Sequence, residues 1–189
     1  MRCLLGIAAF CMSLTLGGCA DFSALMNGQS KAYAQAQKSP LILSSHQAIG
    51  ELIQGVRKHD LMGTPVLVAT VVNVNHLKST TPLGRTLSEM YASQLSNAGF
   101  NVKELKLRGS VYVKEGTGEL LLSREIRDIA HQHKAGLVLV GTYSQAKQFT
   151  YVSLKLVRTA DSRIIRSHDY ALPNEIDVQR LLASSVDAN

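Results

Sequence analysis

The sequence has no tryptophan, and its three cysteines all lie within the first 19 of 189 residues, at Cys3, Cys11 and Cys19. If a leader ending before Cys19 is removed, a single cysteine remains. That number excludes an internal disulfide, and it leaves no thiolate set for structural zinc. We therefore expect neither structural zinc nor thiol catalysis, and a folded part that depends on its apolar core.

The N-terminal apolar run is too short for a membrane-spanning helix. Arg2 and the free amino group provide a short positive region, and residues 4–16 form an apolar run of signal-peptide length. The run closes on residues that resemble the bacterial lipobox, namely Leu16, Gly17, Gly18 and Cys19. The resemblance implies a signal peptide over 1–18 and lipidation of Cys19. The alternative is a plain signal peptide or an uncleaved anchor, with Cys19 incidental.

Lipidation at Cys19 predicts where the protein is held. Each buried acyl methylene contributes about 0.8 kcal/mol, so the three chains implied by the resemblance would make attachment effectively permanent. Ala20 stands at the lipoprotein sorting position, where Asp would favour the inner membrane, and Asp21 comes one place too late. We expect a lipid anchor in the outer membrane, with the domain facing the periplasm.

Acidic residues are scarce, with 14 Asp and Glu against 20 Lys and Arg and a net charge of +6. Loss of Arg2 with the leader lowers that charge to about +5, which suits anionic neighbours such as phospholipid headgroups, lipopolysaccharide or peptidoglycan carboxylates. Nucleic acid is not expected as a partner. The basic residues are dispersed along the chain, tryptophan is absent, and export removes the target.

The rest of the chain divides into a tether and one domain. Residues 19–44 are small, polar and poorly patterned, as is typical of a tether. A coil of about 25 residues spans only about 25 to 30 Å, which favours a role close to the membrane. Residues 45–186 carry the globular pattern and are long enough for one core.

Apolar residues at helical spacing predict four helices in this domain. Ser44 or Ser45 is able to cap the first helix, Gly99 is expected just past the end of the second, and Ser123 is expected to cap the third. The predicted helices are residues 46–60, 82–98 and 123–133, with a short C-terminal helix from near Asn174.

Five extended runs predict the sheet. Residues 65–72 and 137–143 are apolar on both faces and therefore predict central, buried strands. Residues 100–107 alternate imperfectly, as expected near a sheet edge, whereas residues 149–158 and 164–172 form an antiparallel hairpin. The fold class is α/β: a single domain with a mixed, roughly five-stranded sheet covered by helices.

Histidines and glycines that suggest ligand binding have simpler interpretations. His131 and His133 are two positions apart on a helix, so their side chains point about 200° apart and do not share a metal. Both suit the negative end of a helix instead. Gly116, Thr117 and Gly118 lack the spacing of nucleotide-binding loops and are interpreted as a flexible loop.

Nucleophilic catalysis has no recognisable motif. Ser110, Ser123 and Ser144 are candidate nucleophiles, but none stands in a Gly-x-Ser-x-Gly elbow. The histidines show no partner spacing; they are His46, His59, His76, His131, His133 and His168. Glu115, Glu119 and Glu125 are interpreted as loop and helix-start charges. We expect no catalytic residue, no metal and no cofactor, so a non-enzymatic protein.

Several segments of the domain resemble the FlgO domain of bacterial flagellar outer-membrane lipoproteins. The similarity spans about residues 46–173, and it is carried by residues 82–89, 123–125, 135–143, 156–158 and 161–164. It implies a non-enzymatic, protein-binding component of a flagellar basal-body accessory assembly that supports flagellar stability or motility. The implied partners are other flagellar or envelope proteins, with homo-oligomers left open. The alternative is an envelope lipoprotein that regulates a peptidoglycan synthase.

Three residues of the resembling segments also have a physical interpretation of their own. Gly84 permits a close approach at a helix start, and Gly141, inside an apolar strand, indicates close packing of a neighbour. Arg85 projects from the first turn of its helix, and we expect it to stabilise the fold through a carboxylate or a carbonyl rather than to bind a ligand.

Overall fold

The computed structural model describes residues 31, 34–56, 64–77, 79–104 and 124–183. The chain divides into two units, Met1–Lys38 and Ser39–Asn189. Within the first unit, residues 34–36 are helical and exposed. The expected signal peptide and Cys19 lie outside the described residues. The second unit contains the sheet and its helices, and it is the domain described below.

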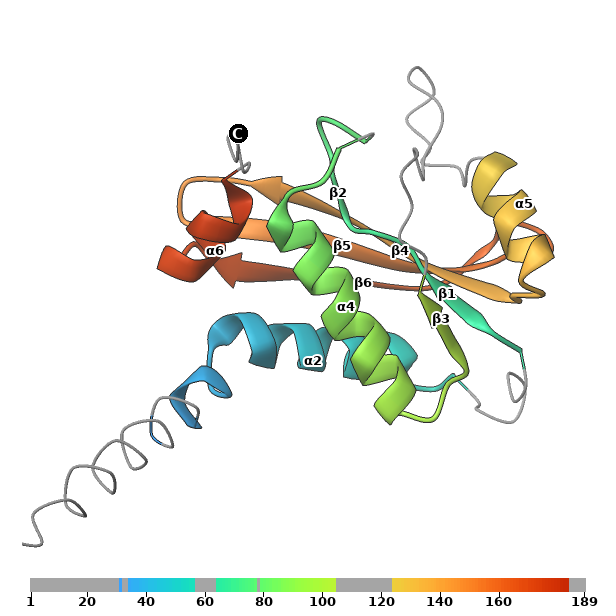
Figure 1. The fold of residues 1–189 in the computed structure, drawn as a ribbon, viewed down its shortest axis with the longest axis horizontal. Helices are drawn as coiled ribbons and strands as arrows, with labels where there is room; N and C mark the ends of the chain where they lie inside the picture. The colour runs from blue at the N-terminus through green and yellow to red at the C-terminus, as the bar shows by residue number, and fades with distance from the viewer. Residues whose placement is uncertain (1–30, 32–33, 57–63, 78, 105–123, 184–189) are drawn as a thin grey trace, which may run out of the picture. The chain divides into compact units, whose positions relative to one another are not determined.

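A mixed sheet forms the centre of the domain, and its described strands number six. They are β1 (Val66–Val68), β2 (Val72–Asn73), β3 (Val102–Glu104), β4 (Leu137–Gln145), β5 (Phe149–Arg158) and β6 (Ile164–Pro173). Their spatial order is β3-β1-β4-β5-β6, with β2 also beside β4 (Figure 1). Strand β1 runs parallel to β3 and β4, whereas β4, β5 and β6 are antiparallel neighbours. The α/β class, the mixed sheet and the edge position of β3 are confirmed.

The predicted strand over 65–72 is divided into β1 and β2 because Val71 leaves the hydrogen-bond ladder. The Val71 N–H donates to Ser88 Oγ at 2.8 Å, and the Thr80 hydroxyl donates to the Val71 carbonyl at 2.6 Å. Two side chains from later in the chain thus satisfy both backbone groups of this residue. This division accounts for six strands where five runs were expected.

The first helix of the domain, α2 (Pro40–Ile53), begins earlier than the predicted range of 46–60. Ser39 is its N-cap and accepts a hydrogen bond from the Ile42 N–H at 3.4 Å, while Pro40 occupies the first turn, where its missing N–H is not needed. The capping role expected for Ser44 or Ser45 is therefore wrong. Ser45 is buried inside the helix, and α2 takes the last residues of the segment expected to be tether.

The next helix, α4 (Pro82–Asn97), agrees closely with its predicted range. Gly99 has a φ of +87° and follows the C-cap Ala98, which confirms its expected place just past the helix end. The start of the helix packs against the Val71 carbonyl and the Thr80 hydroxyl. A Cβ at Gly84 would lie well under 3.0 Å from both oxygens, so the close approach expected there is confirmed.

Helix α5 (Arg124–Gln132) ends without a glycine in the left-handed position that follows many helices. Lys134 has a φ of +51°, and the N–H of Ala135 donates to the carbonyl of Ala130 at 2.8 Å. These features form a Schellman motif with lysine in the left-handed position. The expected cap Ser123 lies outside the described residues.

The last helix, α6 (Ile176–Leu182), begins after Asn174, near the expected position. Val178 and Leu182 are buried, whereas Ile176 is 68% exposed. None of the described helices combines the length and the apolar character needed to cross a membrane.

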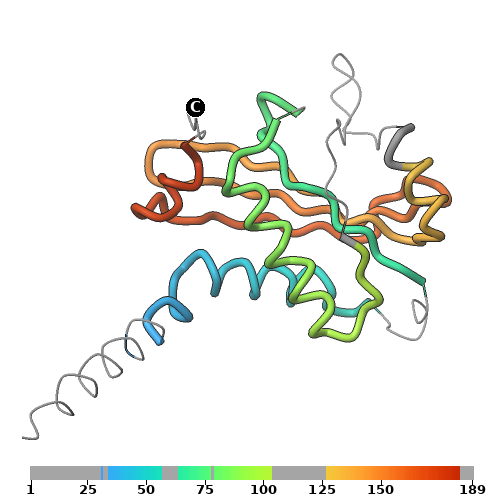
Figure 2. The backbone as a smooth tube through the Cα atoms, viewed as in Figure 1, coloured from blue at the N-terminus to red at the C-terminus, as the bar shows by residue number. Residues whose placement is uncertain are grey.

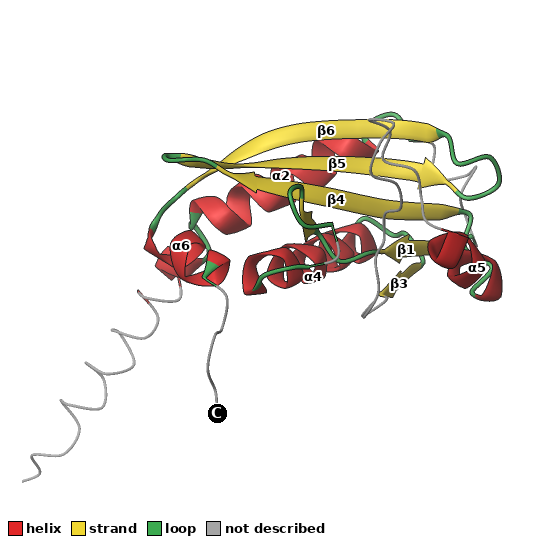
Figure 3. Ribbon diagram, turned by 90° about the horizontal axis from the view of Figure 1, so that it is seen from above, coloured by secondary structure: helices red, strands yellow, loops and turns green. Residues whose placement is uncertain are grey.

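One face of the sheet is covered by α2, α4 and α6, as Figures 1 and 3 show. Leu139, Leu154 and Leu172 point into this layer from three neighbouring strands and are at most 1% exposed. Helix α2 packs against β6 and α4, and α4 also contacts α6. Three helices that are separated in the sequence thus form one layer on this face. The tube in Figure 2 traces the chain between them.

The opposite face is covered only in part by described residues. Helix α5 lies at the end of the sheet away from α6 (Figure 3), where Ala130 packs with Val138, Val140 and Val157. Strand β4 is therefore buried on both faces at this end, as expected. No other described helix covers this face, and Tyr151 on β5 is 55% exposed. The expectation of helices over the whole sheet holds for one face and for one end of the other.

Gly141 marks a tight contact inside β4. A Cβ built at this position would lie 2.9 Å from a methyl group of Leu154 and 3.1 Å from one of Val71. Real Cβ atoms essentially never approach closer than 3.0 Å, so a methyl group here would force the side chain of Leu154 or Val71 to shift. The close packing expected at Gly141 is confirmed.

Candidate functional site

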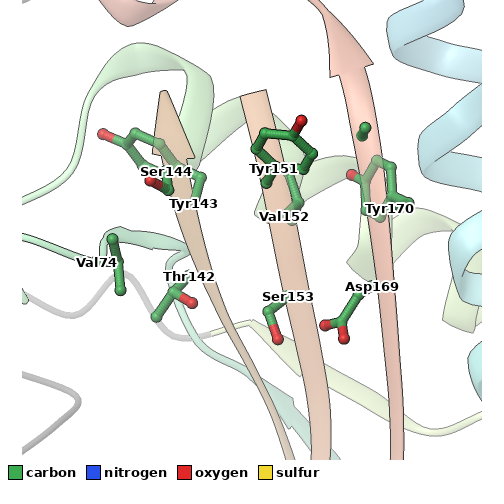
Figure 4. A pocket seen from close by; sticks show the side chains of 10 residues that line it. Val74, Thr142, Tyr143, Ser144, Tyr151, Val152, Ser153, Asp169 and Tyr170 are labelled. Atoms are coloured by element: carbon green, nitrogen blue, oxygen red, sulfur yellow. The ribbon is translucent and has the colours of Figure 1, made fainter. Parts of the chain in front are cut away.

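A groove of about 550 Å³ lies over the antiparallel part of the sheet. Its floor includes a row of three polar side chains that are direct register neighbours: Thr142 on β4, Ser153 on β5 and Asp169 on β6. Figure 4 shows this row crossing the three strands. Side chains alternate along a strand, so these residues project away from the layer formed by α2, α4 and α6. The groove therefore lies on the partly uncovered face.

A second row, parallel to the first, gives the groove its apolar character. Ser144, Tyr151 and Ala171 are register neighbours on β4, β5 and β6. Val74, which follows β2, lines the groove beside Thr142 (Figure 4) and is 41% exposed. The groove thus combines exposed apolar surface with several hydroxyl groups.

The aromatic surface continues past the groove along β5. Phe149 lies two residues before Tyr151 on the same side of the strand and is 39% exposed. The two ring centroids are 6.5 Å apart and the rings are tilted by 48°. Exposed aromatic rings are enriched in binding surfaces because they bury a large area with few rotatable bonds.

Two other tyrosines lie below the groove and belong to the core. The Tyr143 hydroxyl donates to Thr81 Oγ1 at 3.0 Å. The hydroxyl groups of Tyr170 and Tyr91 are hydrogen-bonded to each other between β6 and α4. Burial, with the neighbouring Tyr170 a smaller cause, raises the pKa of Tyr91 well above its usual value. These hydrogen bonds fix β4 and β6 under the groove.

Asp169 supplies the only carboxylate among the described residues that line the groove. It is exposed, and no other described residue forms an ion pair with it. Thr142, Ser144 and Ser153 offer hydroxyls that both donate and accept hydrogen bonds. The described lining therefore presents negative charge and acceptor atoms, but no cation.

The groove also lies close to a reversal in the order of the strands. From β1 the chain crosses by α4 to β3 on one side, and from β3 it crosses by α5 to β4 on the other. In open α/β sheets, ligands commonly bind near the carboxyl ends of the strands at such a reversal. Thr142 and Ser144 lie in the carboxyl-terminal half of β4, on the groove side.

The histidines considered in the sequence do not gather at the groove. His131 is on α5 and His133 follows it, while His46 is on α2 and His76 follows β2. His168 stacks on Tyr170 with the ring centroids 6.4 Å apart. Across the part of the chain that the structure describes, no three His, Cys, Asp or Glu side chains form a group able to hold a metal ion.

Among the candidate nucleophiles, Ser144 lines the groove. Its described neighbours there are hydroxyl, aromatic and apolar side chains, without a histidine to act as a base. Ser110, His59, Glu115, Glu119 and the glycine segment 116–118 lie outside the described residues, as does the side chain of Glu125.

Arg85 does not have the stabilising contact that was expected. Its side chain is exposed on α4, and no ion pair or side-chain hydrogen bond joins it to another described residue. The nearby buried contacts are made by Gly84 and Ser88 instead, and Ser88 Oγ donates to the Gly84 carbonyl at 2.8 Å.

The polar row of the groove was missed in the sequence because its members lie on three separate strands. Thr142, Ser153 and Asp169 have no common spacing, and the register that joins them is a product of the fold. One signal was present. Phe149 and Tyr151 fall on the side of β5 opposite its apolar row, where two aromatic residues are unusual for a solvated face.

Comparison with known proteins identifies the family. A family model described as FlgO protein matches residues 46–177. The C-terminal domain of LpoB from Salmonella enterica is 16% identical, with a TM-score of 0.47 over 68% of this chain and 95% of that chain. A PelC dodecamer from Paraburkholderia phytofirmans gives 15% identity and a TM-score of 0.42 over 59% and 72%. Lipoprotein GNA1162 from Neisseria meningitidis gives 13% and 0.40 over 57% and 81%.

These three TM-scores lie below 0.5, so the structural similarities carry no argument about function. No curated protein matches the chain. The family match, in contrast, covers most of the sequence and the whole span, about residues 46–173, over which the segments of the domain resemble the family. The chain belongs to the FlgO family.

Proposed function

We propose that this chain is a lipoprotein of the outer membrane that acts by binding other proteins of a flagellar basal-body accessory assembly and so supports flagellar stability or motility. The match to the FlgO family model is the observation that carries the proposal. The matched residues, 46–177, make up nearly all of the folded domain. Cys19 would hold the protein at the membrane through its acyl chains.

The position of the domain along the chain supports a role near the membrane. Helix α2 begins at Pro40, so the segment between Cys19 and the domain is shorter than the sequence suggested. As a coil, its 20 or so residues would span roughly 25 Å. A domain on such a tether meets partners close to the membrane surface before it meets more distant ones.

The groove supports binding rather than catalysis. Its described lining offers hydroxyl groups, one carboxylate and exposed apolar side chains, and an acid–base pair is absent from it. General acid–base chemistry needs a titratable group held within hydrogen-bond reach of the reacting proton, and no hydrogen bond to a described residue positions Asp169 for that role. An open groove with exposed tyrosine is instead typical of a surface that another protein contacts.

The proposal is tested in a bacterium that carries this gene and builds flagella. Deletion of the gene is expected to reduce swimming and to leave damaged or missing flagella, and the wild-type chain is expected to restore both. A tagged chain purified from membranes should bring with it basal-body components identified by mass spectrometry. Normal swimming with intact flagella would contradict the flagellar role, and altered cell-wall synthesis would favour regulation of a peptidoglycan synthase instead.

The anchor is tested by Cys19→Ser. This change removes the acyl acceptor and leaves every described core residue intact, so we expect a folded protein without lipid label that no longer partitions with the outer membrane. Cys11→Ser is the matched control and should be labelled normally. A Cys19→Ser protein that keeps both its lipid label and its membrane location would show that Cys19 is incidental.

A further inference from the structure

We propose that the groove over β4, β5 and β6 receives a basic side chain, Arg or Lys, from a partner polypeptide. Its aliphatic part would lie on Tyr151 and Val74, and its cationic group would reach Asp169. This inference rests on the proposed protein-binding function and names the chemistry of the contact. It joins three observations: exposed apolar walls, an acceptor-rich floor and a carboxylate without a described partner.

The walls suit the stem of a long basic side chain. Tyr151 is 55% exposed and Val74 is 41% exposed, and both line the groove. Arg and Lys bury their methylene groups along apolar surface while the charged group stays in contact with polar atoms. The face of the Tyr151 ring also attracts a cation that lies within about 6 Å of its centre.

The floor suits the cationic group. Asp169 is the diagonal neighbour of Tyr151 across β5 and β6, since Ser153 pairs with Asp169 and Tyr151 pairs with Ala171. Diagonal side chains on one face of a sheet are within reach of long groups placed between them. The hydroxyls of Ser153 and Thr142 continue the same row and can accept hydrogen bonds from a guanidinium or an ammonium group.

The charges around the groove agree with this occupant. Lys155, which pairs with Ser167, is the other diagonal neighbour of Asp169, but no ion pair joins these two described side chains and Lys155 does not line the groove. The chain as a whole carries a net charge of +6, so a local site with a carboxylate and no described cation differs from the rest of the protein. Such a site attracts a basic side chain over an acidic one.

A polypeptide fits the lining better than a sugar does. A sugar would find hydrogen-bond partners in Thr142, Ser153 and Asp169, but it would bring no cation to pair with the carboxylate. A partner polypeptide also covers the neighbouring aromatic surface at Phe149, which is 39% exposed.

The test uses the full chain, isotopically labelled and held in detergent micelles, with N-acetyl-arginine-methylamide as the probe. Titration should shift the NMR signals of Thr142, Tyr151 and Ser153, and Asp169→Asn should weaken binding about fivefold. Asp169 is exposed, so this variant should melt like the wild type. Glu89→Gln, which removes an exposed carboxylate from α4 on the opposite face of the sheet, is the matched control and should bind the probe normally.

Four results would overturn the inference. Equal binding by Asp169→Asn and the wild type would show that the carboxylate is not used. Equal shifts with N-acetyl-norleucine-methylamide would show an apolar contact alone, and stronger shifts with N-acetylglucosamine would assign the groove to sugars. Concentration-dependent dimerisation of the wild type that Asp169→Asn abolishes would assign the groove to a second copy of the chain.

The two proposals fail in different ways. If basal-body proteins copurify equally well with Asp169→Asn and with the wild type, the chain binds proteins through another surface, and only the inference about the groove is lost. If no such protein copurifies with the wild type, the proposed function fails whatever the probe shows.

Discussion

Adjacent residues of β5 lie on opposite faces of the sheet and differ sharply in exposure. Val152 and Leu154 point into the layer of α2, α4 and α6 and are at most 1% exposed, while Tyr151, between Thr150 and Val152, is 55% exposed on the other side. Hydroxyl, carboxylate and aromatic side chains gather on that second side. The antiparallel part of the sheet thus packs against helices with one face and exposes polar and aromatic side chains on the other, because side chains alternate along each strand.

This comparison predicts that substitutions on the covered sides reduce stability, whereas substitutions at the groove change binding alone. The exception is the end of the second face beneath α5. There β4 is buried on both sides, and a change on either side should unfold the domain.

The largest effect is expected from Val140→Asp. Val140 is 2% exposed in the cluster beneath α5, and an unpaired carboxylate there would cost more than about 4 kcal/mol, enough to unfold a domain of ordinary stability. Lys147→Asp, in the exposed turn between β4 and β5, is the control and should be nearly neutral. Thermal melts of both proteins supply the measurement. A Val140→Asp protein that melts like the wild type would mean that β4 is not a central strand.

The next largest effect is expected from Gly84→Ala, because its Cβ would overlap the Val71 carbonyl and the Thr80 hydroxyl. Displacing α4 from the break between β1 and β2 should lower the free energy of unfolding by about 2 to 3 kcal/mol. Gly50→Ala on α2 is the matched control. A Cβ there meets nothing within 4 Å, so this change should stabilise the helix by about 0.5 to 1 kcal/mol. Denaturant unfolding measures both, and two changes of equal sign would contradict the packing at Gly84.

A pair of tyrosines compares the two sides more directly. Tyr91→Phe leaves the Tyr170 hydroxyl without its partner from α4 and should lower the free energy of unfolding by about 1 to 2 kcal/mol. Tyr151→Phe, on the open side, should change it by less than about 0.5 kcal/mol. Urea denaturation at neutral pH distinguishes them. Equal losses of unfolding free energy in the two variants would mean that the Tyr91 hydroxyl does not contribute to stability.

Alkaline pH tests the same buried pair. Burial raises the pKa of Tyr91 well above 10.0 in the folded protein, whereas the unfolded chain ionises near that value. The unfolded state thus loses its proton first, so the contribution of Tyr91 to stability is constant below pH 10 and falls as the pH rises above it. The double variant Tyr91→Phe with Tyr170→Phe should lose less stability between pH 9 and 11 than the wild type. Parallel profiles would contradict the shifted pKa.

The smallest effect is expected at the turn between β5 and β6. Arg158 Nε lies 3.0 Å from Asp161 Oδ1 and its Nη2 lies 2.8 Å from Oδ2, but both side chains are exposed. Hydrogen bonding to Arg158 lowers the pKa of Asp161, so its contribution is present at neutral pH and is lost as the pH falls through the range where the carboxyl gains its proton. Asp161→Asn should shift the thermal midpoint only slightly at pH 7 and not at all at pH 2. A large shift at pH 7 would show that the turn organises the hairpin.

Much of the fold follows from local patterns in the sequence. The apolar run of β4 predicts a strand buried on both faces, and alternation over residues 149–158 predicts which side of β5 faces the helices. Gly84, Gly99 and Gly141 were interpreted correctly because each has a steric role that no other residue can take. These signals depend on neighbours in the chain, so sequence reveals them.

The missed features depend on contacts between distant residues. The break at Val71 requires hydroxyls from Thr80 and Ser88, and nothing in the β-branched run indicates it. The groove likewise requires the register of three strands. The early start of α2 is different, because Ser39 and Pro40 form a recognisable start signal that was interpreted as part of a tether.

The attachment of α2 to the sheet has a mechanical consequence. If Cys19 carries the proposed anchor, any pull between the membrane and the domain enters the fold at Ser39 and runs into α2. That helix lies against β6 and α4 and buries Leu41, Ala48, Ile49 and Leu52 along its length. A load is then spread over several turns of packed side chains instead of acting on the end of one strand.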